Sequence, residues 1–238
     1  EAFFTQIFSA LTASIGNLLI EKNKEKTYET YKKLQLFNFW ITGFCAVSFY
    51  NIITPFIKLL YGDTYLLPEI VTIVITIKFY AQNMKKCIIS FKEAAGIFHV
   101  DRFMPVLEAI VNIIVSVILV QFFGIAGVFV GTIISSLVLY CYAFPKYTYK
   151  PLFGKSYKVY AKEKLYYFSI FILSLIITSI IVKPIIVENL ILQIIINGVL
   201  CLIIPNIIYI LIFRKKEEYL YFKDMLLGFK FIKQLKNS

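Results

Sequence analysis

The sequence predicts an all-α fold, a polytopic bundle of about seven membrane-spanning helices. Of the 238 residues, 59% are hydrophobic and only 16% are charged. The apolar residues gather in blocks of about twenty with almost no charge inside them, and a helix of that length crosses a hydrocarbon core of about 30 Å. This pattern excludes soluble enzymes, disordered tails and small secreted proteins held by disulfide bonds.

Apolar runs, bounded mostly by proline, glycine or charged residues, define the expected spans. Their ranges are 2–20, 36–57, 66–84, 103–123, 125–145, 165–183 and 189–213. Pro205 falls inside the last span and is expected to kink it. The chain thereby divides into five spans in 1–145, a basic loop at 146–164, two further spans in 165–213 and a basic tail at 214–238.

The tail has its own pattern, because Phe222, Met225 and Phe229 recur at helical spacing among lysines. Such spacing predicts a helix that lies in the headgroup plane, and a solvated basic tail is the alternative.

The cations predict the orientation of the bundle. All but three of the 25 lysines and arginines lie in the connections 21–35, 85–102 and 146–164 or in the tail. The positive-inside rule makes that side cytoplasmic, so residue 1 starts outside and the C-terminus lies inside. Because the chain begins at Glu1 without a signal peptide, we expect an odd number of upstream spans and hence the C-terminal half of a longer protein.

The residues offer no set for covalent or metal-assisted catalysis. His99 is the single histidine, the four cysteines show no repeated spacing, and no phosphate-binding glycine loop is present. We expect no enzyme activity, metal or cofactor, and we assign the net charge of +11 to anionic lipid headgroups rather than to nucleic acid. Transport is favoured because it needs only a polar path with alternating access.

Lys78 is the most informative polar residue, because it lies near the middle of the third span. An unpaired charge there costs about 2.5 to 3.5 kcal/mol, so it is expected to face a polar cavity or a partner. Gln82 and Lys85 follow at helical spacing and extend a polar stripe toward the cytoplasm, which suits an anionic substrate. The alternative is a structural pair with a carboxylate on another helix.

Other polar residues allow two interpretations, a substrate path or packing between helices. On the fourth span Glu108, Asn112 and Ser116 share one face, with Arg102 or Lys85 close enough to neutralise Glu108, and packing is slightly favoured. Gln6 and Asn17 on the first span are weaker path candidates, and Gln193 with Asn197 on the last span allows both interpretations. The glycines at positions 124, 127 and 131 are expected to serve a tight turn and close helix packing.

Several stretches together resemble the C-terminal half of bacterial polysaccharide flippases. They are LYGDTYLL at 60–67, DRFMP at 101–105 followed by Glu108, Asn112 and Ser116, GIAGV at 124–128, GTIIS at 131–135, and Pro145. The family comprises the Wzx-type transporters of the multidrug/oligosaccharidyl-lipid/polysaccharide flippase superfamily.

The resemblance implies one lobe of a two-lobed fold around a central cavity, in the bacterial cytoplasmic membrane. Such proteins flip undecaprenyl-diphosphate-linked oligosaccharides for O-antigen, capsule or exopolysaccharide synthesis, beside membrane lipids, polysaccharide polymerases and glycosyltransferases. Lys78 is the position that fits a diphosphate-binding residue. The alternatives are a multidrug or cation antiporter of the same superfamily, and a membrane-embedded glycan polymerase or acyltransferase.

Overall fold

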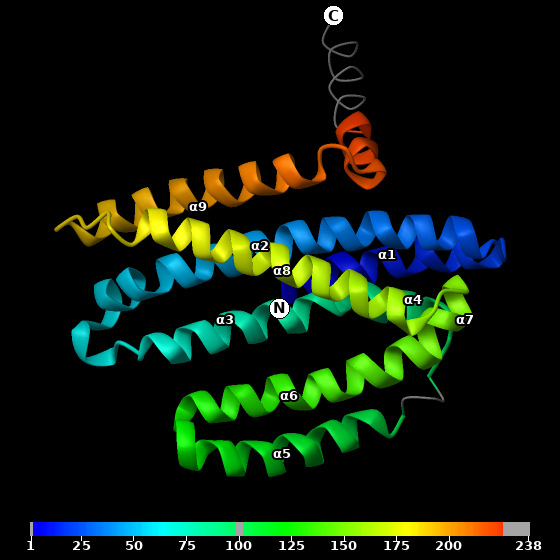
Figure 1. Ribbon diagram of the computed structural model, residues 1–238, viewed down its shortest axis with the longest axis horizontal. Coiled ribbons are helices and arrows are strands. Elements are labelled where there is room, and N and C mark those ends of the chain that lie inside the picture. Colours follow the sequence, from blue (N-terminus) through cyan, green and yellow to red (C-terminus); the bar gives the residue numbers. More distant parts are fainter. Residues whose placement is uncertain (1, 99–101, 226–238) are drawn as a thin grey trace, which may run out of the picture.

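The computed structural model describes residues 2–98 and 102–225, and within them every regular element is helical (Figure 1). The long helices are α1 (Ala2–Ile20), α2 (Lys24–Tyr61), α3 (Glu69–Met84), α5 (Met104–Phe123), α6 (Ile125–Phe144), α8 (Tyr157–Val182) and α9 (Leu190–Phe213). The short elements are a 3-10 turn (Asp63–Tyr65), α4 (Lys86–Ala94), a π turn (Pro145–Tyr149) and α7 (Lys150–Phe153). The predicted all-α class is confirmed, and each expected span falls largely within one long helix.

The helices are those of a membrane-embedded protein. Among the described residues, α2, α5, α8 and α9 are long and apolar enough to cross a membrane, and shorter apolar helices cover Phe4–Ile20 and Ile125–Leu137. The third expected span is followed directly by a break. Its helix, α3, ends at Met84, and α4 begins directly after Lys85, so a break interrupts an otherwise helical rod.

The bundle has one end at which the described cation-rich connections meet. The turn at 21–23, the end of α4 and the segment 145–156 lie there, and we call it the basic end (Figure 1). The helix α9 runs toward this end and stops short of it, where Glu218 pairs with Lys32 of α2 at 3.0 Å. The connections at 62–68, 124 and 183–189 lie at the opposite end. This is the alternation that the lysine and arginine positions predict.

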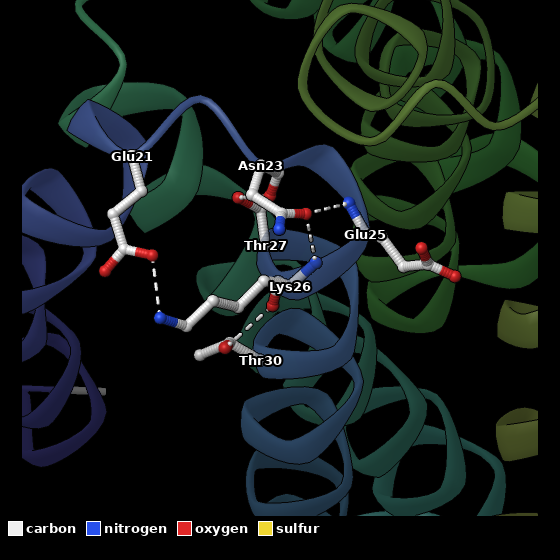
Figure 2. Close-up of polar contacts among 6 residues, drawn as sticks. All are labelled: Glu21, Asn23, Glu25, Lys26, Thr27 and Thr30. Carbon is white, nitrogen blue, oxygen red and sulfur yellow. Dashed lines mark hydrogen bonds and ion pairs between the residues drawn. The ribbon is translucent and has the colours of Figure 1, made fainter.

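Two expected connections are largely helical. The helix α2 begins at Lys24, well before the apolar stretch, because Asn23 caps it: its Oδ1 accepts from the backbone N–H of Glu25 (3.1 Å) and of Lys26 (3.0 Å) (Figure 2). Lys26 also pairs with Glu21 at 2.7 Å. The basic stretch 146–164, expected to be a loop, contains most of the π turn, α7 and the first two turns of α8, which precede the membrane-spanning part at 165–182. Polar residues can form helices as readily as apolar ones, so hydropathy underestimates helix length.

The core is aromatic and centres on α2, which packs against α3, α8 and α9. Tyr80 stacks on Phe171 with ring centres 4.1 Å apart, and Phe39 contacts Tyr209 at 5.0 Å. α6 packs against α3, and α5 lies beyond α6 at the edge of the bundle (Figure 1). The exposed isoleucines and valines of α5 are the side chains expected to face lipid.

The glycine positions confirm their expected packing role. Gly124 has a φ of +55° in the turn between α5 and α6. A Cβ at Gly127 would lie 2.3 Å from the Leu119 carbonyl oxygen, and one at Gly131 would lie 2.2 Å from Ser116 Oγ. The two helices therefore approach too closely for any larger residue at these positions.

Candidate functional site

Lys78 lies midway along α3 and is half-buried toward α6. Its Nζ is 5.1 Å from the centre of the Phe129 ring, a cation–π contact. Among the described residues, no carboxylate lies within 4.0 Å of this ammonium. The face of α3 toward α6 therefore carries a mid-helix charge whose described partner is an aromatic ring.

A cavity of about 470 Å³ lies between α3, α6 and α8, in the half of the bundle near the basic end. Most of its lining is apolar, with Ile77, Ile133 and Phe168 from the three helices. Two lysines, Lys85 between α3 and α4 and Lys164 of α8, also line it. The cavity thus combines an apolar wall with two cations, a combination that suits an amphiphile with an anionic headgroup.

Glu108 and Asn112 connect α5 to α6 through hydroxyl groups. Ser136 Oγ, whose residue lines the cavity, donates to Glu108 Oε1 at 2.5 Å. The partner of Glu108 is therefore this hydroxyl and not Arg102 or Lys85, which were expected to neutralise it. Asn112 Nδ2 donates to Ser135 Oγ of α6 at 3.4 Å, and its Oδ1 accepts from Ser116 Oγ, one turn along α5, at 3.1 Å. These contacts serve the packing of the α5–α6 hairpin.

The other expected path residues are not gathered with these. Gln6 and Asn17 lie on an exposed face of α1, and α1 packs against α4. Gln82 is half-buried on α3, one turn beyond Lys78. The structure thus brings Lys85 to the cavity, places Glu108 against the cavity residue Ser136, and leaves the two α1 residues on a separate surface.

Lys164 was not predicted as a site residue, because it stands one position before the expected span and was assigned to the basic loop at 146–164. Its Nζ donates to Gln35 Oε1 of α2 (3.0 Å) and to the carbonyl of Met84 at the end of α3 (3.2 Å). Burial among these helices lowers the pKa of Lys164 to about 8. The sequence does contain a feature that could have indicated a polar contact here. It is the pair Gln35 and Asn38, which stands at the start of an otherwise apolar segment of α2.

Glu163, beside Lys164, has a separate set of partners at the basic end. Its carboxylate accepts from Tyr28 of α2 and, at 2.7 Å, from Tyr149 of the π turn. Burial and the neighbouring carboxylate raise the pKa of the Tyr149 phenol. One carboxylate thereby joins α2, the π turn and α8.

A second cavity, of about 670 Å³, lies at the opposite end, near the turns that follow α2 and α8. Glu69 accepts from Tyr50 at 2.7 Å and pairs with Lys183. Deeper in the bundle, Gln193 donates to Asn197 (2.8 Å), and Asn197 donates to the backbone carbonyl of Asn51 (3.0 Å). This chain of amides joins α9 to α2, so its described contacts are those of helix packing.

Comparison of the chain with protein-family models, with curated proteins and with solved structures finds no match.

His99 and the tail beyond Met225 lie outside the described residues. The described start of the tail, 217–225, is helical. No group of three histidine, cysteine, aspartate or glutamate side chains able to hold a metal occurs in the part of the chain that the structure describes. The candidate site is therefore the cation-lined cavity with Lys78 beyond it on α3.

Proposed function

We propose that this chain is part of a transporter that flips undecaprenyl-diphosphate-linked oligosaccharide repeat units across the bacterial cytoplasmic membrane, with the basic end in the cytoplasm. The observation that carries the proposal is the cavity between α3, α6 and α8, which has apolar walls and the cations Lys85 and Lys164. An undecaprenyl diphosphate is an amphiphile with a compact anionic group, so its parts fit the two kinds of lining.

The position of Lys78 adds support. It lies about two turns from Lys85 along the chain, so a diphosphate leaving the cavity along α3 would meet a third cation near mid-membrane. Phe129 is its described partner, so a diphosphate need not displace a carboxylate to reach the ammonium. The resemblance of the 60–67, 101–105 and 124–135 stretches to polysaccharide flippases points to the same substrate class.

The test uses a strain from which the complete gene has been deleted. Restoring the wild-type gene is expected to clear accumulated lipid-linked repeat units and to restore surface polysaccharide, and Lys78→Ala is expected to restore neither. Lys162→Ala, which removes an exposed cation from α8, is the matched control and is expected to behave as wild type. Full export with Lys78→Ala would refute its role. Drug efflux without any change in lipid-linked repeat units would instead favour the multidrug antiporter.

A further inference from the structure

The side chain of Lys164 is held at the wall of the cavity by groups that carry no charge. Its Nζ donates to Gln35 Oε1 of α2 at 3.0 Å and to the Met84 carbonyl at the end of α3 at 3.2 Å. It also lies 5.3 Å from the centre of the Tyr160 ring of α8, which lines the same cavity. Contacts from α2, α3 and α8 therefore fix the position of this ammonium without neutralising its charge.

The ammonium of Lys164 has no carboxylate partner within 4.0 Å in the part of the chain that the structure describes. The carboxylate of the adjacent Glu163 instead accepts from two tyrosine hydroxyls. By contrast, the partly buried Lys32 at the same end of the bundle pairs with Glu218 at 3.0 Å. A cation withdrawn from water costs free energy unless an anion compensates it. The counter-ion of Lys164 is therefore expected to come from a ligand.

The third N–H donor of this ammonium lacks an oxygen acceptor among the described residues. An ammonium has three such donors, and oxygens of Gln35 and Met84 accept from two of them. Lys164 is half-buried and lines the cavity of about 470 Å³, so a ligand in the cavity can accept from the remaining donor. The surrounding wall is mostly apolar, which strengthens the attraction between an anion and this cation.

We propose that the cavity binds the phosphate group of an amphiphile as the counter-ion of Lys164, and that Gln35 is the positioning residue that keeps this charge available to the ligand. The amide oxygen of Gln35 orients the ammonium without cancelling its charge, whereas a carboxylate at the same place would cancel it. The apolar wall holds the hydrocarbon chain to which the phosphate is esterified. No covalent bond changes.

Two kinds of membrane molecule share this chemistry, an isoprenoid diphosphate and an anionic phospholipid of the bilayer. Lys85 also lines the cavity, and two lysines match a diphosphate better than the single negative charge of a phosphodiester. The choice of an isoprenoid diphosphate rests on the proposed function, whereas the anion site rests on the contacts of Lys164 alone. The experiment therefore treats the two separately.

The experiment measures the Kd of farnesyl diphosphate for the complete protein in phosphatidylcholine nanodiscs by calorimetry, with empty nanodiscs subtracted. Lys164→Met, which removes the charge and keeps a long side chain, is expected to raise the Kd roughly 10- to 100-fold, as for a lost hydrogen bond to a charged group. Lys162→Met removes an exposed cation two positions away and is expected to bind as wild type. Equal Kd values for wild type and Lys164→Met, or equal binding of farnesol and farnesyl diphosphate, would overturn the anion site.

Gln35→Glu tests the positioning role while keeping Lys164 in place. The new carboxylate would lie beside the ammonium and supply its counter-ion from within the protein. Farnesyl diphosphate is therefore expected to bind roughly 10- to 100-fold more weakly. The thermal midpoint is expected to stay equal or to rise, because the new ion pair joins α2 to α8. An unchanged Kd, or a fall in both affinity and midpoint, would overturn the role of Gln35.

Adding phosphatidylglycerol to the nanodiscs distinguishes the two sources of phosphate. The Kd of farnesyl diphosphate is expected to change little if the site takes isoprenoid diphosphates. Displacement by phosphatidylglycerol that depends on Lys164 would support the anion site with a bilayer lipid as its ligand, and it would count against the proposed function. Normal binding by a protein that fails to clear lipid-linked repeat units would likewise retain the anion site and reject only the proposed function.

Discussion

Gly127→Ala is expected to destabilise the hairpin of α5 and α6, although the same change in an open helix would stabilise it. The added Cβ would lie 2.3 Å from the carbonyl oxygen of Leu119 and 2.4 Å from its carbonyl carbon, both backbone atoms. A backbone cannot rotate away as a side-chain tip can. The two helices must therefore separate by about 1 Å to reach ordinary contact distance.

The magnitude follows from two opposing effects. Alanine lowers the conformational entropy of the unfolded chain, which stabilises a helix by about 0.5–1 kcal/mol. Overpacking in a tight contact typically costs about 1–3 kcal/mol. Separation also stretches the contact of Ser116 Oγ with the Val128 carbonyl, which is already 3.4 Å long. The expected net effect is a loss of about 1–2 kcal/mol in the free energy of unfolding.

Gly198→Ala is the matched control, because Gly198 lies inside α9 and a Cβ there would have no heavy atom within 4 Å. This variant is expected to be unchanged or more stable by up to about 1 kcal/mol. Unfolding of both variants in mixed micelles with increasing SDS, followed by circular dichroism, measures the difference. Equal midpoints for Gly127→Ala and Gly198→Ala would refute the close approach of α5 and α6.

Three further substitutions test contacts elsewhere in the bundle. Glu163→Ala removes the shared acceptor of Tyr28 and Tyr149 and is expected to lower the free energy of unfolding by about 3 kcal/mol. Its thermal midpoint is expected to lie below that of the control Glu29→Ala, which changes an exposed residue, and equal midpoints would contradict the shared contact. Asn23→Ala is expected to cost about 1 kcal/mol in the same assay by uncapping α2, whereas Asn23→Asp is expected to retain the cap. Asn197→Val is expected to cost roughly 0.6–2 kcal/mol by separating α9 from the Asn51 carbonyl, and midpoints matching wild type would show that this bond contributes little.

The spans were predictable because their signal is local. A block such as 103–123 is mostly apolar and holds a single charged residue, and any helix in a membrane must satisfy its backbone internally, so length and composition suffice. Gly127 and Gly131 were likewise readable, since small residues three and four apart mark close helix contacts. The start of α2 at Lys24 could not be predicted in this way, because hydropathy detects where the apolar stretch begins and not where a capped helix begins.

The candidate site was only partly predictable, because it depends on which helices become neighbours. Lys78 was found through its depth in a span, but its contact with Phe129 requires that α6 pack against α3. Lys164 was missed because its charge placed it outside the expected span, and only the packing of α8 against α2 and α3 brings it to Gln35 and Met84. The position of a charge along the chain is visible in a sequence, whereas the direction of its side chain is not.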